Sequence, residues 1–166
     1  MSIKHSLLIE LERETKNTAR ILERLSDEHL TWKPHVKSMS VKALANHIVN
    51  LHRWVQHVLA KPVFDLHVDF RPEIATSVEG LLTNLEASYV ANKQLIEAST
   101  EEIWLEHWTM SAGEHEIVTL PKVGAMRYIV TNHLIHHRGQ LTVYLRLLDI
   151  PVPGLYGPSA DDSMLA

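Results

Sequence analysis

Two histidines four residues apart, His133 and His137, carry the clearest chemical signal in this chain of 166 residues. They lie in a long segment whose apolar residues recur at helical spacing. Each residue of an α-helix turns by about 100°, so the two imidazoles lie about 40° apart on one face. A pair of this kind is a typical half-site for zinc or a related divalent ion. His136 lies about 100° from His137, so we do not expect it to bind the same ion.

The face that the two histidines share favours a common ion over the alternative, a histidine-rich helix surface without metal. Several large apolar residues lie within about 60° of His133, which predicts that this face points to the core; they include Met126, Ile129, Val130 and Leu147. Polar groups without a partner are costly in a core. A metal ion is the simplest partner that two imidazoles can share, and it requires at least a third ligand.

The third ligand is predicted to be His47, on a helix expected over residues 41–60. His47 lies in the middle of the apolar face of that helix. His52 is about 140° away and His57 about 80° away, which predicts a surface and a boundary position for them. A single core-facing histidine is more often a hydrogen-bonded core residue, so that alternative stays open.

Four long helices are expected to position these histidines. Apolar periodicity, capping residues and proline positions predict them over residues 3–25, over 41–60, from 78 onward and over 121–148. Residues 26–39 and 61–75 are predicted to be connecting segments. Residues 99–120 are less regular and indicate a short helical turn followed by a small hairpin. The Pro/Gly-rich segment 150–166 cannot continue the last helix, and we expect it to pack on the helices as a tail.

Three polar residues on the apolar faces of the first and third helices are candidates for lining a pocket. Thr15 and Thr18 interrupt the apolar stripe of the first helix, and Tyr89 lies near the middle of the third. The alternative is that they are polar residues tolerated beside a neighbouring helix or at a surface edge.

Gln140 and Tyr144 lie within about 20° of His133 along the last helix. Gln140 is a candidate for orienting a ligand or binding substrate, and Tyr144 for donating a proton. The alternative for Gln140 is a polar contact between helices, and the alternative for Tyr144 is a buried tyrosine at the end of the bundle. Arg138 points about 140° away from His133. We expect it to pair with an acid of a neighbouring segment, such as Asp161 or Asp162 of the tail.

The composition restricts the class of protein. The length suits one domain over residues 1–166. A net charge of −4 leaves no basic surface typical of nucleic-acid binding. The absence of cysteine excludes disulfides, thiolate metal ligands and a cysteine nucleophile. No segment is typical of a signal peptide or a membrane span, so we expect no membrane partner and a cytoplasmic protein.

Several blocks of the sequence resemble the DinB/YfiT-like family, in the order typical of that family. They are Trp32-Lys-Pro-His-Val-Lys-Ser-Met-Ser, Leu44-Ala-Asn-His47, and His133-Leu-Ile-His-His137-Arg-Gly-Gln-Leu followed by Tyr144-Leu-Arg and by Pro153-Gly-Leu-Tyr-Gly-Pro-Ser-Ala-Asp. The resemblance implies an all-α fold, a four-helix bundle with a short irregular or hairpin insertion before the last long helix. It also implies one divalent metal ion per chain on His47, His133 and His137, the residues that the helical faces indicate.

The resemblance further implies a homodimer and chemistry of a thiol-dependent kind. Characterised relatives use low-molecular-weight thiols such as bacillithiol or mycothiol for transfer or isomerisation, although many members have no known reaction. Zinc and nickel both suit three imidazoles. An ion with an open position activates bound water or a bound thiol.

We therefore expect a metal-dependent transferase or hydrolase that activates a thiol or water for attack on a small electrophilic substrate. Neither ligand helix contains a glutamate that would serve as a general base, which favours a thiol over water. A non-catalytic protein that binds a metal or small ligand in a stress response is one alternative. Histidines that bind no metal are the other.

Overall fold

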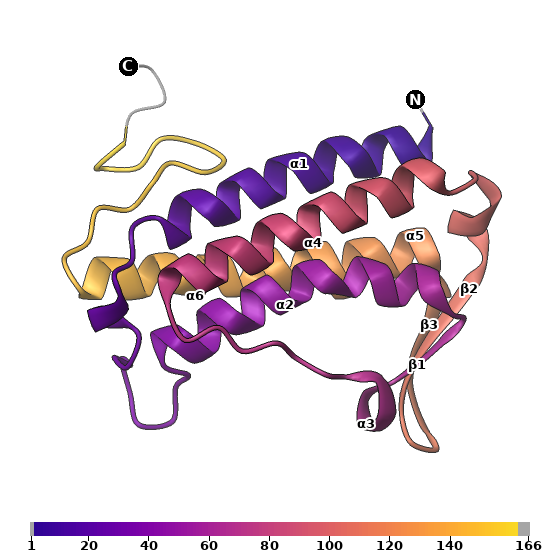
Figure 1. Ribbon diagram of the computed structural model, residues 1–166, viewed down its shortest axis with the longest axis horizontal. Helices are drawn as coiled ribbons and strands as arrows, with labels where there is room; N and C mark the ends of the chain where they lie inside the picture. Colours follow the sequence, from indigo (N-terminus) through magenta and orange to yellow (C-terminus); the bar gives the residue numbers. More distant parts are fainter. Residues whose placement is uncertain (1, 163–166) are drawn as a thin grey trace.

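The computed structural model describes residues 2–162, and these residues are mostly helical. Long helices lie side by side along the molecule (Figure 1): α1 (Ile3–Leu22), α2 (Val41–Ala60), α4 (Val78–Ala98) and α6 (Asn132–Leu147). Helix α4 packs on both α1 and α2, and α2 packs on α6. Short helical segments connect them: η1 (Asp27–His29), α3 (Leu66–Asp69), η2 (Glu102–Leu105) and α5 (Lys122–Ala125).

Serine side chains cap the first turns of the helices, as the sequence predicts for the second and third. Ser40 Oγ accepts a hydrogen bond from the amide of Ala43 at 3.2 Å, and Ser77 Oγ accepts one from Gly80 at 3.1 Å. These bonds satisfy amides that have no partner inside the helix. Helix α1 ends at Leu22, three residues before the predicted end.

A small three-stranded sheet lies at one end of the helices, so the expectation of an all-α fold is wrong in this respect (Figure 1). Strands β2 (His107–Ala112) and β3 (His115–Pro121) form the antiparallel hairpin that the sequence predicts. Strand β1 (Val63–Asp65) was predicted to be a loop, and it pairs with β2 in parallel. Three residues are too few for a periodic pattern, and the hydrogen bonds of β1 come from a strand distant in sequence.

The last long helix contains a π-helical turn, Met126–Thr131, that changes its buried face. Downstream, the buried side chains are Leu134, Arg138, Leu141 and Leu145. Upstream, Met126, Ile129 and Val130 are buried. A π-helical turn adds one residue to a turn, which rotates the downstream helix by about 100° relative to the upstream part. The two histidines therefore lie half-buried beside the core stripe, and not within it as predicted.

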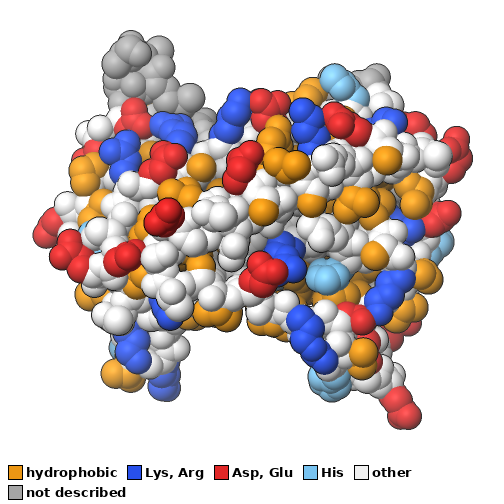
Figure 2. All heavy atoms as spheres, viewed as in Figure 1, with side chains coloured by type: hydrophobic (Ala, Val, Ile, Leu, Met, Phe, Trp, Pro, Cys, Tyr) orange, Lys and Arg blue, Asp and Glu red, His pale blue; other side chains and the backbone are white. Residues whose placement is uncertain are grey.

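The last described residues contact the helices through ion pairs. Asp162 accepts a hydrogen bond from Arg20 of α1 at 2.6 Å, and Asp161 pairs with Arg146 of α6 at 2.5 Å. Residues 163–166 of the predicted tail lie outside the described residues. Acidic and basic side chains are interspersed on the face shown in Figure 2. No helix of the described chain is both long and apolar enough to cross a membrane.

Candidate metal centre

Three histidines from two helices converge on one point. His47 comes from α2, and His133 and His137 come from successive turns of α6. The Nε2 atom of His133 lies 3.3 Å from Nε2 of His47 and 2.8 Å from Nε2 of His137. One ring nitrogen from each residue lies within 4.8 Å of the other two. The structure thus brings together the three residues that the helical faces indicate.

The environment of the cluster favours neutral imidazoles. Burial lowers the pKa of His47 to about 4, and the neighbouring rings of His137 and His133 add to this effect. Burial also lowers the pKa of His133, and the nearby rings of His137 and His136 lower it further. A neutral imidazole has one N–H group and one nitrogen lone pair, and the lone pair is what a metal ion binds.

Neighbouring groups favour one protonated nitrogen in the rings of His137 and His133. Gln140 Oε1 accepts a hydrogen bond from Nδ1 of His137 at 2.8 Å, and the amide group of Gln140 donates to Nε2 of His136 at 3.1 Å. The ring of His133 is hydrogen-bonded to the backbone of Ile129, in the π-helical turn. With their N–H groups used in this way, His133 and His137 direct Nε2 lone pairs toward each other.

This arrangement of donors fits a divalent cation. Facing lone pairs at hydrogen-bond distance repel each other, and a cation bound between them removes this repulsion. Two imidazole nitrogens on a tetrahedral zinc ion are about 3.4 Å apart, close to the 3.3 Å between His47 and His133. Among the described residues, no carboxylate joins the group. Three protein ligands leave at least one position open on an ion of this type.

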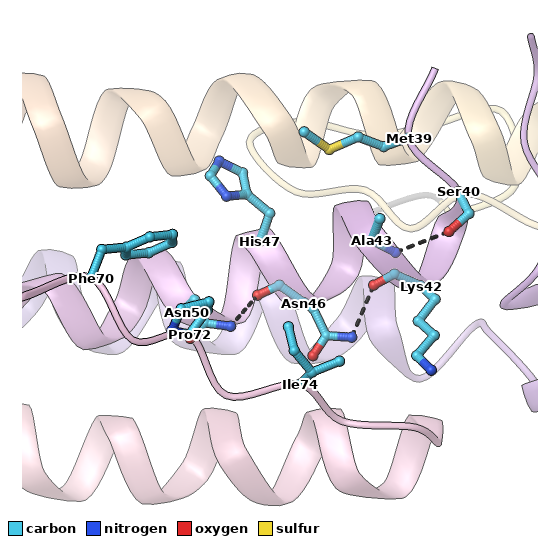
Figure 3. A pocket seen from close by; sticks show the side chains of 10 residues that line it. All are labelled: Met39, Ser40, Lys42, Ala43, Asn46, His47, Asn50, Phe70, Pro72 and Ile74. Carbon is cyan, nitrogen blue, oxygen red and sulfur yellow. Dashed lines mark hydrogen bonds between the residues drawn. The ribbon is translucent and has the colours of Figure 1, made fainter. Parts of the chain in front are cut away.

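Each of two cavities is lined by one histidine of the cluster, His47 or His133. The first, here called the His47 cavity, has a volume of about 390 Å³ and is shown in Figure 3. The second, the His133 cavity, has a volume of about 540 Å³ and is also lined by His136, Trp54 and Met110. The ring of Phe70, in the His47 cavity, contacts the ring of Trp54 at 5.9 Å between centroids. An ion held between His47 and His133 would therefore face both cavities.

The other predicted pocket residues lie in different places. Gln140 contacts His137, as described above. Tyr144 packs edge-on against Trp32 and donates a hydrogen bond to the carbonyl of Met39 at 3.2 Å. Thr15 and Tyr89 line a cavity of about 350 Å³ between α1 and α4, which none of the three histidines lines.

Thr18 belongs to a buried polar network that the sequence only partly indicates. Its hydroxyl lies 3.1 Å from Nε2 of His52 and accepts a hydrogen bond from Arg138 at 3.1 Å. Arg138 also donates to Glu14 and to Tyr156. The predicted partners of Arg138, Asp161 and Asp162, instead bind the arginines described above. Arg138 does pair with an acid of a neighbouring segment, but with one from α1.

The predicted surface position of His52 is wrong, because its side chain is 2% exposed. Helix α2 packs on α1 and α4 as well as on α6, so more than one of its faces is buried. Burial lowers the pKa of His52 to about 3, and the positive charge of Arg138 adds to this effect.

Sequence reasoning missed two asparagines that flank His47. Asn46 accepts a hydrogen bond from the amide of Ala75 at 2.7 Å and donates to the carbonyl of the same residue at 3.0 Å. Asn50 binds both backbone groups of Glu73 in the same way, at 3.0 and 2.7 Å. The signal was two amide side chains one turn apart on an otherwise apolar face.

Comparison with known proteins identifies related sequences. The sequence model described as the DinB family matches residues 1–164. YjoA of Bacillus subtilis, an uncharacterized protein, is 26% identical over 129 residues, which are 78% of this chain and 80% of YjoA. YrdA of the same organism, also uncharacterized, is 41% identical over 39 residues, and this match spans only 24% of this chain and 23% of YrdA.

Two solved structures have a similar fold. A DinB-like protein from Bacillus cereus has a TM-score of 0.66 at 22% identity, over 87% of this chain and 92% of that one. The structure of YjoA, a DinB-like protein from Bacillus subtilis, has a TM-score of 0.69 at 20% identity. The match covers 88% of this chain and 96% of YjoA. At these identities the likeness concerns the fold alone.

Proposed function

Because the chain belongs to the DinB family, we propose that His47, His133 and His137 bind one divalent ion, zinc or nickel, in a metal-dependent enzyme. The observation that carries the proposal is the convergence of three imidazoles whose Nε2 atoms lie 2.8 and 3.3 Å apart. In two of the three rings the other nitrogen is engaged with Gln140 or with the backbone of Ile129. The nitrogen donor atoms are therefore oriented to bind a cation before the cation arrives.

The ion would lower the pKa of a bound thiol or water, so that the deprotonated nucleophile exists near neutral pH. The protein contributes neutral ligands, the orientation of His137 by Gln140, and apolar side chains in the walls of the His47 and His133 cavities. In the thiol reaction, sulfur forms a bond to an electrophilic carbon of the substrate. The leaving group departs with its electron pair, and the thiol proton passes to solvent.

Two features of the site support a low-molecular-weight thiol over water as the nucleophile. No carboxylate joins the histidine group among the described residues, so the usual general base for water is not supplied there. Two cavities at the cluster offer space for two organic molecules, whereas hydrolysis requires space for only one. The preferred activity is therefore thiol transfer, with hydrolysis as the second reaction.

A non-catalytic protein that binds a metal or a small ligand, with a role in a stress response, is the competing proposal. Within the described part of the chain, the absence of a carboxylate from the histidine group also suits this role.

We further propose that α1, α2, α4 and α6 form a four-helix bundle. We also propose that the protein is a homodimer. Sedimentation at micromolar concentration tests the dimer, and a monomer there contradicts it.

Metal content is the test of the site. Purified untagged protein, incubated with zinc or nickel and then desalted, should hold about one ion per chain. The His47→Ala variant should lose most of it, whereas His115→Ala in the exposed hairpin should not. Wild-type protein that holds no metal after incubation contradicts the proposal. Metal-loaded protein should then be assayed with a panel of thiols and electrophiles, since turnover separates the enzyme from the binding protein.

A further inference from the structure

Much of the wall of the His47 cavity is apolar. It lies along α2, between α6 and the segment that leads into α4 (Figure 3). Its apolar lining consists of Met39, Ala43, Phe70, Pro72 and Ile74. A volume of about 390 Å³ is in the range of sites for small molecules. The body of a ligand that fits this cavity must therefore be apolar.

The amide side chains in the wall are not available to a ligand. Asn46 and Asn50 each bind the N–H and C=O groups of one residue in the opposite wall, Ala75 and Glu73. Each amide group also donates to a carbonyl of α2, at 2.9 and 2.8 Å. These bonds hold residues 73–75 against α2, so the cavity exists before any ligand binds. They also remove the amides as hydrogen-bonding partners for the ligand.

One cation borders the cavity. Lys42 lies five residues before His47 on α2, which corresponds to about 7.5 Å along the helix axis. Figure 3 shows its side chain extending away from His47, with the ammonium group beyond the other labelled side chains. None of the ion pairs among the described residues involves Lys42. A positive charge at one end of an apolar cavity complements a negative charge on the ligand.

We infer that the His47 cavity binds the electrophilic substrate, and that this substrate is a small amphiphile with an apolar body and an anionic group at one end. The apolar body lies against Phe70 and Ile74. The anionic group, such as a carboxylate, pairs with Lys42, and the reacting carbon lies beside His47. The position of the reacting carbon rests on the proposed function, whereas the binding of the amphiphile does not.

Binding of two unreactive probes tests the inference. 4-Phenylbutyrate and the neutral 4-phenylbutan-1-ol share an apolar body and differ in charge. Calorimetric titration of zinc-loaded protein, with the metal content of each sample measured separately, should show that both bind. The carboxylate should bind about fivefold more tightly, the size expected for a partly exposed ion pair. Weaker or equal binding of the carboxylate would overturn the role of Lys42.

Matched variants locate the binding site. Lys42→Gln should abolish the preference for the carboxylate, whereas Lys93→Gln on α4 should preserve it. Ala43→Phe fills the cavity from an exposed position of α2 and should weaken the binding of both probes at least tenfold. Ala60→Phe, at the exposed end of the same helix, should leave the binding of both probes unchanged. Unchanged binding in Ala43→Phe places the probes elsewhere and overturns the inference.

The two proposals fail in different ways. Protein that holds metal but binds neither probe overturns the inference and leaves the metal site intact. Protein that binds the carboxylate with the expected preference but holds no metal supports the amphiphile site and overturns the proposed function.

Discussion

At the residue scale, the buried His52 is a group whose charge the fold opposes. The hydroxyl of Thr18 donates to the carbonyl of Glu14 at 2.9 Å, so its lone pairs are left to accept from Arg138 and from Nε2 of His52. His52 is therefore a neutral donor, and a second proton on its ring would lie close to the guanidinium of Arg138.

This environment predicts a loss of stability in mild acid. The pKa of His52 is about 3 in the folded chain and about 6.5 when unfolded, so the unfolded chain binds one more proton between these values. The contribution to stability is complete above pH 6.5 and is lost as the pH falls toward 3. By pH 5.5 it should have fallen by about 1.4 kcal/mol. Urea unfolding of the wild type and of His52→Gln measures this, and equal pH dependence in both would contradict it.

Gln140 is the residue whose contact with a metal ligand is easiest to remove. Its carbonyl holds the N–H group of His137 at 2.8 Å. Gln140→Leu should leave the helices intact and weaken zinc binding by about 10- to 100-fold, as is usual for a group that orients a histidine ligand. Competition with a chelator measures the affinity, with Gln94→Leu on the exposed face of α4 as the control. Unchanged affinity would show that Gln140 does not orient the ligand.

At the element scale, paired asparagines attach an extended segment to α2. Asn46 and Asn50 are one helical turn apart, and the residues that they bind, Ala75 and Glu73, are two apart in an extended chain. One helical turn rises about 5.4 Å and two extended residues about 6.6 Å, so the two spacings nearly match. The match explains how side chains of a helix replace the partner strand that this segment lacks.

Loss of one of these amides should release the segment. Asn46→Ala leaves the buried backbone groups of Ala75 without their partner, which should cost about 1 to 3 kcal/mol. Hydrogen exchange at Ala75 should become faster, and Asn84→Ala on α4 should change neither quantity. Exchange at Ala75 that remains slow would mean that the segment is held by packing alone.

At the scale of the whole molecule, one buried ion pair joins α1, α6 and the C-terminal segment. Arg138 is 1% exposed and donates to Glu14 of α1 and to the hydroxyl of Tyr156. Burial and the hydrogen bond to Glu14 raise the pKa of Tyr156 to about 12, so its neutral hydroxyl donates to the carboxylate. The pair thus connects residues more than 120 positions apart in the sequence.

Removal of this carboxylate should be far more damaging than removal of a similar one at the surface. Glu14→Ala leaves the guanidinium of Arg138 buried without a counterion, which should cost about 3 to 5 kcal/mol. The matched change is Glu12→Ala, which removes an exposed pair with Lys16 and should cost far less, because solvent screens an exposed pair. Chemical denaturation measures both. Equal losses would show that Arg138 finds another partner or reaches water.

The long helices and the three histidines of the candidate centre were predictable from the amino-acid sequence. Helix geometry sets the direction of each side chain from its neighbours, so the spacing of His133 and His137 and the apolar position of His47 could be interpreted locally. The serine caps of α2 and α4 are local for the same reason. The hairpin was also predictable, because its two strands are adjacent in the chain.

Features that depend on partners distant in sequence could not be predicted and are visible in the folded chain alone. Strand β1 exists because β2 lies beside it, His52 is buried because α1 and α4 cover a second side of α2, and Arg138 binds Glu14 because α1 packs on α6. The π-helical turn rotates the histidine face to the edge of the core, where His133 lines a cavity. These outcomes depend on packing between segments, and a periodic pattern within one segment contains no information about them.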